Sequence, residues 1–378
     1  MTGLMFLFWF APKKGFFTER IRNDWPILLF GLWVVWNGIS MSYTQRLETG
    51  FNQWIIQLPL LLFPVGILSM NRFRKPEIRL FENGFMLSLL LAWLITLAIG
   101  LGVFITTDIP WDEAFTYATF TERILQHPTY LALMVNIALI FLLYRSPMKH
   151  GDIWLITGFI LFLLMTAARL QVFLGIGIIA AVVFFRYPTY RKWVGVGILG
   201  ITLLGILAIA LFPEEAERLR DLWEYENVEN VRYSGTAVRI ALWNGCLEEI
   251  SQNPWWGIGI GGVQPALEAT YQAKGLNLTG LGPHNQYLST TMSLGVPGLL
   301  LLVASLFIPL WKAIRQKRFV AATLLILFIM GCLTEDLLSR QIGVCILAIW
   351  LPITWEMRDT NPGEEKESMP ALRQVDTK

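Results

Sequence analysis

The chain has 378 residues, of which 54% are hydrophobic and only 15% are charged, and its mean hydropathy is +0.52. A soluble globular protein carries about 25% charged residues, so this chain cannot cover a water-exposed surface with polar groups. The formal net charge of +2 excludes a nucleic-acid-binding protein that works by bulk electrostatics. The 24 Phe and 16 Trp fit a chain in a bilayer, because Trp favours the boundary between lipid and water. The composition predicts an integral membrane protein.

A hydropathy window of about 19 residues predicts ten membrane spans. In chain order they lie at 26–43, 53–70, 84–105, 128–144, 152–169, 171–186, 193–212, 287–311, 319–335 and 341–356. The fifth and sixth come from one apolar stretch, which as a single helix would measure about 50 Å against a hydrocarbon core of about 30 Å. We therefore expect two spans here, joined by a tight turn at Arg169–Gln171.

The distribution of Lys and Arg between loops predicts the orientation of these spans. With the N-terminus in the cytoplasm, each short outer loop carries one basic residue, whereas the inner loops carry several. The inner residues are Lys13, Lys14, Arg20, Arg22, Arg72, Arg74, Lys75, Arg79, Arg145, Lys149, Arg186, Arg191, Lys192, Lys312, Arg315, Lys317 and Arg318. The outer ones are Arg46, Arg123, Arg169 and Arg340. Both termini are therefore expected in the cytoplasm, the last residues as a disordered, charged tail.

One long connection, 213–286, falls on the outer side and is expected to be a folded, mostly helical periplasmic domain. Within it, 237–250 has helical spacing, with apolar residues at Ile240, Trp243, Leu247 and Ile250. The expected fold is an all-α, polytopic transmembrane helical bundle of about 10 spans. Its parts are an N-terminal bundle (1–212), this loop domain (213–286), C-terminal transmembrane helices (287–356) and a cytoplasmic tail (357–378).

The three cysteines, Cys246, Cys332 and Cys345, form no CxxC motif, which argues against a disulfide framework or a zinc site. The glycine run 257–262 mimics a nucleotide-binding fingerprint, but no strand precedes it, so we interpret it as a loop. The chain has no GxxxxGK[ST] motif and no Asp-x-Asp, which argues against an ATP site and against a metal-dependent sugar-nucleotide transferase. No cofactor, metal or nucleotide is expected.

Three histidines are the candidate bases. His150 lies in an inner loop, where it is expected to be solvated, and His127 precedes Pro128, where an interfacial or capping role is expected. His284 stands in Gly-Pro-His-Asn-Gln-Tyr-Leu, where the long loop re-enters the membrane at the level of lipid headgroups. It is either a helix-start residue or a general base, since an imidazole titrates near neutral pH.

Cationic and acidic side chains surround this position in the predicted topology. Arg169 and Arg239 are each either an exposed interfacial charge or a phosphate-binding group, and Arg232 is a further phosphate contact. Glu335, Asp336 and Arg340 cluster at the outer turn between the last two spans, either as an ion-paired helix end or as a wall of the site. Asn285 and Tyr287 follow His284 directly and are candidate supporting residues.

Three stretches together resemble the O-antigen ligase family, whose superfamily includes O-antigen polymerases and oligosaccharyltransferases. They are Thr166–Arg169, the run from Gly235 to Trp256, and Pro283–Leu288 with the following Ser-Leu-Gly-Val-Pro-Gly. The family commonly has about a dozen spans, against ten here, so up to 12 spans are expected. It also often has a small polar residue where this chain has Ala168.

The resemblance implies an inverting glycosyltransferase of the bacterial inner membrane that needs neither metal nor sugar nucleotide. It implies transfer of a glycan from undecaprenyl pyrophosphate to a sugar hydroxyl of lipid A core on the periplasmic face. By the same resemblance His284 is the base, and Arg169 and Arg239 hold the pyrophosphate. The partners implied are this lipid-linked donor, the lipid A core acceptor and the bilayer.

Two other functions compete with the ligase. An O-antigen or exopolysaccharide polymerase uses the same donor, and the sequence barely separates it from a ligase. A polysaccharide or lipid transporter is the alternative from a different class; the chain shows no internal repeat, and its candidate charges lie at the outer edge.

Overall fold

The computed structural model describes residues 22–69, 73–116, 120–124, 126–197, 235–274 and 280–357, and within these ranges all regular structure is helical. The α-helices are α3 (Leu29–Ser40), α4 (Leu47–Gln57), α5 (Pro59–Ser69), α6 (Lys75–Thr106), α7 (Trp111–Phe115), α9 (Pro128–Tyr144), α10 (His150–Met165), α11 (Arg169–Arg186), α14 (Gly235–Gln252), α15 (Val263–Ala273), α16 (Gln286–Arg315), α17 (Phe319–Gly331) and α18 (Gln341–Trp355). Short 3-10 turns are η1 (Trp25–Leu28), η2 (Glu122–Ile124), η3 (Pro188–Tyr190) and η5 (Leu337–Ser339). The expected all-α class is confirmed for this part of the chain.

Four stretches of the described chain are long and apolar enough to cross a membrane: Leu47–Ser69, Lys75–Thr106, Arg169–Arg186 and Gln286–Arg315. Four shorter apolar helices accompany them: Pro128–Tyr144, His150–Met165, Phe319–Gly331 and Gln341–Trp355. The chain is therefore a multi-pass membrane protein. Of the predicted span at 193–212, residues 198–212 lie outside the described residues, and the number of spans stays a prediction.

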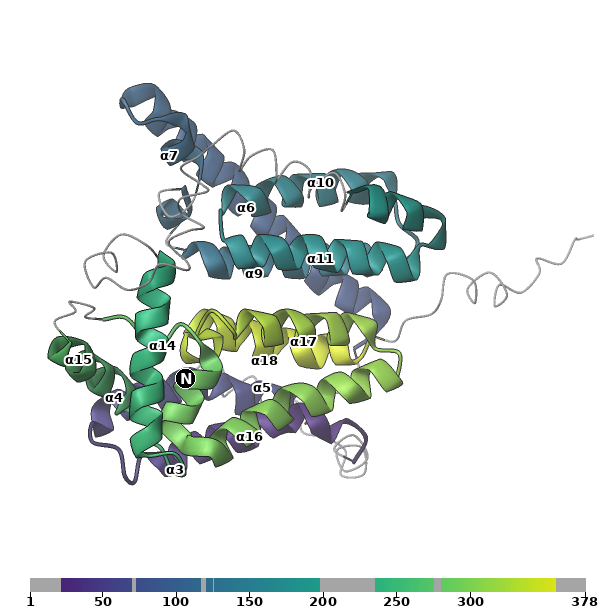
Figure 1. Cartoon of the computed structure of the whole chain (residues 1–378). Coiled ribbons are helices and arrows are strands. Elements are labelled where there is room, and N and C mark those ends of the chain that lie inside the picture. Colours follow the sequence, from purple (N-terminus) through teal and green to yellow (C-terminus); the bar gives the residue numbers. More distant parts are fainter. Residues whose placement is uncertain are drawn as a thin grey trace, which may run out of the picture.

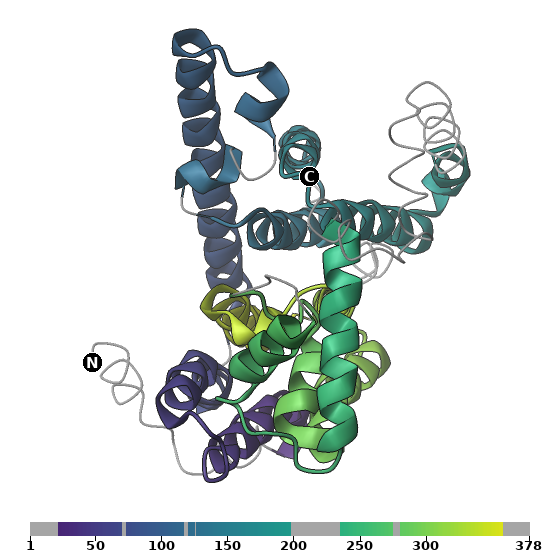
Figure 2. The same ribbon diagram turned by 60° about the vertical axis from the view of Figure 1, so that its left-hand side comes forward.

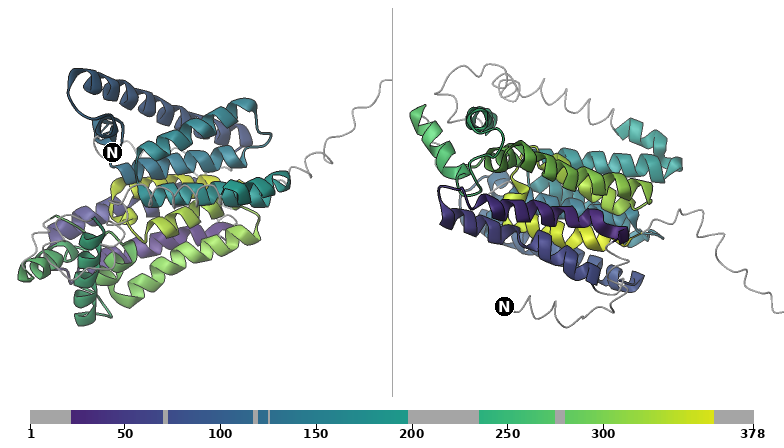
Figure 3. Two further views of the ribbon diagram at one scale, coloured as in Figure 1. Left: turned by 45° about the horizontal axis from the view of Figure 1, so that its top comes forward. Right: turned by 90° about the horizontal axis from the view of Figure 1, so that it is seen from below.

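The helices form a bundle with a small helical unit across one end (Figure 1). Helices α3, α5, α16, α17 and α18 pack together; α9 and α11 lie over α17, and α10 packs on α9 and α11. The view from below in Figure 3 shows α3 running beside α16, in agreement with their contacts. Helix α14 runs crosswise at one end of the bundle, and Figure 2 shows α15 beside it. We call this end the α14 end.

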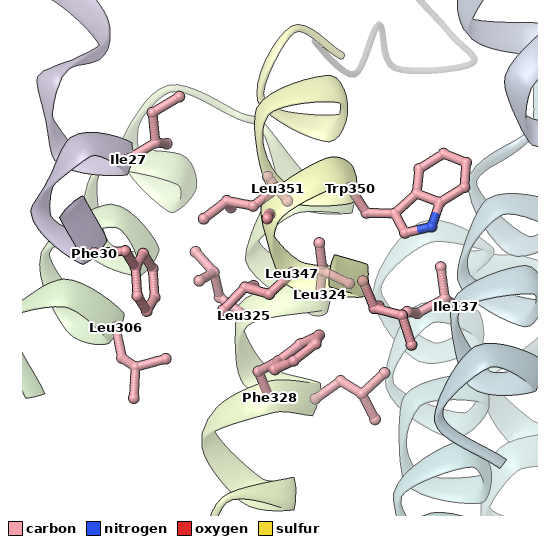
Figure 4. Close-up of a cluster of buried hydrophobic side chains, with 14 of the residues drawn as sticks. Ile27, Phe30, Ile137, Leu306, Leu324, Leu325, Phe328, Leu347, Trp350 and Leu351 are labelled. Atoms are coloured by element: carbon pink, nitrogen blue, oxygen red, sulfur yellow. The ribbon is translucent and has the colours of Figure 1, made fainter. Parts of the chain in front are cut away.

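Helix α17 forms the centre of the hydrophobic core (Figure 4). Its Leu325 and Phe328 are completely buried and point toward side chains of the neighbouring helices, including Leu306 of α16 and Leu347 of α18. On the other side Ile137 of α9 closes the core. Lipid tails are as apolar as leucine, so close packing of these side chains, and not exclusion of water, holds helices together within a bilayer.

The end of the bundle opposite α14 is rich in basic residues, and we call it the basic end. Arg79 of α6 donates to the carbonyl of Ser146 (2.8 Å), and Arg145 pairs with Asp152 of α10 (2.8 Å). Both arginines belong to loops that the sequence assigns to the cytoplasm. Successive helices run in opposite directions, which places both arginines at the end away from α14, where the predicted topology expects them.

Arg318, which the sequence places in an inner loop, has a side chain that is only 3% exposed. Its guanidinium pairs with Asp24 (3.2 Å) and lies 4.8 Å from the centre of the Trp355 ring. The indole of Trp355 donates to the same carboxylate oxygen of Asp24 (2.9 Å). A buried charge needs such partners to offset its loss of water, so these three residues join the two ends of the described chain.

The turn between the fifth and sixth predicted spans lies at 166–168, so the expectation of a turn at Arg169–Gln171 is wrong by three residues. The hydroxyl of Thr166 donates to the carbonyl of Leu163 (2.6 Å), and Ala167 takes a left-handed conformation with φ of 49°. A Thr hydroxyl can donate to one of the last carbonyls of a helix, which have no partner within the helix. Arg169 is therefore the first residue of α11.

Helix α14 confirms the helix predicted at 237–250, but not the whole apolar face that was expected. Leu242 and Cys246 are completely buried, whereas Leu247 is 55% exposed. The difference arises because α15 packs against one side of α14 and contributes Leu267 and Tyr271 to a small shared core. The boundaries proposed for the loop domain remain a prediction.

Helix α16 is broken at Gly295, which has φ of 67° and ψ of −170°. The loop 254–262 fills the break: Ile258 N donates to the carbonyl of Met292 (3.0 Å), and Gly259 N to that of Ser293 (2.9 Å). The glycine-rich run is thus a loop, as interpreted from the sequence, and it satisfies backbone groups that a straight helix would have used.

Replacing Gly295 with Ala is expected to prevent this docking. The new Cβ would lie 2.1 Å from the carbonyl oxygen of Trp255, and the backbone conformation alone costs about 1–3 kcal/mol in a residue with a side chain. We expect a markedly lower melting temperature in detergent, or loss of folded protein. Gly102→Ala on α6, where nothing lies within 4 Å, is the control and should melt at or above the wild-type temperature. Equal melting of the two variants would contradict the assigned role of Gly295.

Candidate active site

The segment before α16 and the turn after α17 meet at the α14 end of the bundle. Gln286, which is 1% exposed, donates its backbone N–H to the carbonyl of Cys332 (2.9 Å). Its side-chain oxygen accepts from the N–H of Leu338 (2.7 Å). Gln286 was not singled out in the sequence, although a Gln directly before an apolar span was a signal that could have identified it. These bonds fix the spacing of the two segments.

Asp336 holds the backbone at His284. Its two carboxylate oxygens accept from the consecutive N–H groups of His284 (3.1 Å) and Asn285 (3.0 Å). His284 has φ of 48°, a left-handed conformation that is uncommon for a residue with a side chain. Such strain persists where neighbouring contacts enforce it and concentrates at functional sites.

Asn285 begins α16 by capping it. Its side-chain oxygen accepts from the N–H groups of Tyr287 (3.0 Å) and Leu288 (3.1 Å), and its amide donates to the carbonyl of Leu333 (3.0 Å). The hydroxyl of Tyr287 donates to the carbonyl of Ile329 (2.9 Å). Both residues were expected to support the site, and both tie the start of α16 to α17.

Glu335 contacts His284 and Arg239 at the same time. One carboxylate oxygen lies 3.2 Å from Nδ1 of His284, and the other lies 3.0 Å from Nη2 of Arg239. The Glu335 side chain is 8% exposed, whereas those of His284 and Arg239 are 30% and 38% exposed. The carboxylate is thus an inner partner, and the imidazole and guanidinium still reach a ligand.

The contact with Glu335 determines what the imidazole of His284 can do. A carboxylate at Nδ1 favours the proton on that nitrogen, which leaves a lone pair on Nε2. The carboxylate also stabilises the imidazolium that forms when Nε2 takes up a proton. The arrangement can therefore remove a proton from a hydroxyl group.

Arg239 reaches this cluster because α14 is tied to the loop before α16. The indole of Trp243, one turn further along α14, donates to the carbonyl of Pro283 (3.1 Å). Only one guanidinium nitrogen, Nη2, makes the contact with Glu335, and the half-exposed side chain has further N–H donors. Arg239 can therefore orient Glu335 and still bind an anion.

Burial raises the pKa of Asp336 to about 6, against the opposing effects of the His284 charge and of the two backbone N–H groups. The adjacent carboxylate of Glu335 raises this pKa further.

Arg169 is not brought into contact with His284 or Arg239. It is the exposed first residue of α11, and within the described ranges it has no recorded hydrogen bond or ion pair. Its helix nevertheless begins near the turn after α17, since the carboxamide of Gln171 borders Gly331. The first N–H groups of α11 and the guanidinium are both positive, an arrangement that suits an anion.

One further candidate, Arg340, takes no part in the described contacts, and another, Arg232, is not described. Arg340 is the exposed residue before α18, and no ion pair of Arg340 is recorded within the described part of the chain, so the expected pairing with the acidic residues is not found. Arg232 lies outside the described residues. Among the residues that are described, no group of three His, Cys, Asp or Glu side chains could hold a metal ion.

Fold and cluster together define a multi-pass membrane protein with an imidazole, a carboxylate and a guanidinium in contact at one end of its bundle. Residues 153–303 match the family model described as O-Antigen ligase, and this match confirms the resemblance to that family seen in the sequence. The match includes Arg169, Arg239 and His284. No curated protein matches the chain. The protein thus carries a domain of a membrane glycosyltransferase family of the O-antigen ligase type.

The raised pKa of Asp336 predicts a pH-dependent stability. The folded protein binds this proton more tightly than the unfolded chain, so the contribution is fully present below the ordinary pKa of 3.8 and is lost as the pH rises through about 6. Asp336→Asn cannot titrate. We therefore expect the difference in melting temperature, wild type minus variant, to decrease as the pH rises from about 4 to about 7. Parallel pH profiles would contradict the assignment.

Proposed function

We propose that the protein is an O-antigen ligase of the bacterial inner membrane. In this proposal it transfers a glycan from undecaprenyl pyrophosphate to a sugar hydroxyl of lipid A core at the periplasmic face, with inversion and without a metal. The observation that carries the proposal is the contact of Glu335 with both His284 and Arg239, inside a chain with an O-antigen ligase domain.

The chemistry follows from the positions of these groups. Nε2 of His284 accepts the proton of the acceptor hydroxyl as its oxygen forms a bond to the anomeric carbon of the donor. The bond from that carbon to the pyrophosphate oxygen breaks, and its electron pair leaves with the pyrophosphate. Attack from the face opposite the leaving group inverts the anomeric carbon.

Negative charge grows on the pyrophosphate, and cations placed in advance stabilise it. Arg239 supplies donors beside the base, because it is bound to the same carboxylate as His284. Arg169 and the first turn of α11 supply a second positive region at a helix start. Basic residues gather at the end opposite α14, and basic loops favour the cytoplasm. This supports the predicted outer position of the α14 end.

His284→Ala should lower the rate of transfer about 10²–10⁴-fold, the usual contribution of a general base. The assay uses the purified protein in detergent, a defined undecaprenyl-pyrophosphate glycan and purified lipid A core, with a chelator present. His150→Ala is the matched control, because His150 begins α10 at the basic end. Full activity of His284→Ala would end the proposal, and loss of wild-type activity with the chelator would contradict its metal-free mechanism.

Arg239→Ala should reduce transfer more than Arg239→Lys, by about tenfold or more, because it removes both an anion ligand and a partner of a nearly buried carboxylate. Lys274→Ala removes another ion pair of the same helical unit, Lys274–Glu248, in which both side chains are about half-exposed. Exposed pairs contribute little, so this control should keep wild-type activity. The same loss in both variants would point to general destabilisation.

A deletion strain separates the ligase from a polymerase with the same donor. Loss of a ligase leaves long glycans on the carrier lipid, whereas loss of a polymerase leaves single repeat units on lipopolysaccharide. The second pattern would reject lipid A core as the acceptor.

A further inference from the structure

His127 is a second histidine at the α14 end. It directly precedes α9, which runs antiparallel to α17; at the basic end the hydroxyl groups of Tyr144 and Thr323 lie 3.0 Å apart. The start of α9 therefore lies at the same end as the turn after α17, which carries Glu335. The sequence suggested only an interfacial or capping role for this residue.

The charges of the cluster already described act on His127. Partial burial lowers its pKa, and the charges of Glu335 and Glu122 raise it, whereas those of His284 and Arg340 lower it. His127 and Glu335 thus belong to segments that meet at the same end of the bundle. Its side chain remains exposed.

The hydrogen bonds of the two imidazoles give them opposite tautomers. Nδ1 of His127 accepts from the backbone N–H of Thr129 (3.4 Å) as it caps α9, so the proton of the neutral ring is on Nε2. In His284 the carboxylate of Glu335 lies at Nδ1, so Nε2 carries the lone pair. Nε2 is thus a donor in His127 and an acceptor in His284.

The environment of His127 suits a neutral ligand. The lowered pKa keeps the ring uncharged at neutral pH, and an edge-on contact with Tyr130, with ring centres 6.0 Å apart, restricts its plane. An uncharged N–H donor in a fixed plane matches a sugar hydroxyl, whereas the two arginines suit a diphosphate.

We propose that His127 binds the acceptor sugar: its Nε2–H donates to a hydroxyl of that sugar while His284 accepts the proton of the attacking hydroxyl. This inference rests on the proposed ligase function, since it assigns the acceptor side of the same site. His127 takes up no proton in the reaction. It fixes the acceptor through a second contact, which restricts which hydroxyl meets His284.

His127→Asn is the decisive variant, because Asn caps a helix start well but has no group at the position of Nε2. We expect it to melt like the wild type, to raise the KM for lipid A core about tenfold and to leave the KM for the donor unchanged. His127→Ala should show the same KM shift together with a lower melting temperature. His150→Asn, at the basic end, is the matched control and should change none of these values.

Direct binding of purified lipid A core, followed by tryptophan fluorescence, separates this inference from the proposed function. A tenfold weaker binding to His127→Asn than to the wild type supports it, even if the wild type transfers no glycan and the ligase proposal fails. Unchanged binding and unchanged KM in a variant that melts normally would overturn it and leave His127 as a helix cap only.

Discussion

The backbone at His284 lies in a left-handed conformation that a residue with a side chain rarely adopts. The Asp336 carboxylate offsets that cost by accepting from the N–H groups of His284 and Asn285. Glu335 directly precedes Asp336 in the same turn. The carboxylate of Asp336, which fixes the backbone, and that of Glu335, which contacts the ring, therefore belong to one short segment. The short turn after α17 thus sets both the position and the tautomer of His284. Everything proposed for the site depends on this pair of adjacent acids.

Much of the fold follows from the sequence, because a span must be apolar over a length set by the bilayer. The predicted 128–144 coincides with α9, and the other described spans differ from their helices mainly at the ends. The turn after Met165 was misplaced because an ordinary Thr hydroxyl ends that helix, with no Gly or Pro to mark it. The buried pair of Arg318 and Asp24 was missed because its members lie far apart in the chain.

The site was predicted in its parts but not in its contacts. His284, Arg239, Glu335 and Asp336 were all candidates, since each is a polar residue where the predicted topology meets the interface. The spacing of residues along the sequence does not show that Glu335 contacts both His284, which is 51 residues away, and Arg239, which is 96 residues away. Arg169, assigned through the family resemblance, begins a helix at the same end but stands outside these contacts, and its role remains a proposal.

The docking of the loop 254–262 ties the N-terminal helices to the break in α16. On one face the loop fills the break in α16; on the other, Ile260 N donates to the hydroxyl of Ser40 and Gly261 N to that of Thr44. The region around Ser40 and Thr44 lies before residues 153–303, which match the family. A chimaera that exchanges only the matched segment between relatives would separate the loop 254–262 from the residues that bind it, Ser40 and Thr44. The bend between α3 and α4 therefore has to be exchanged together with the matched segment.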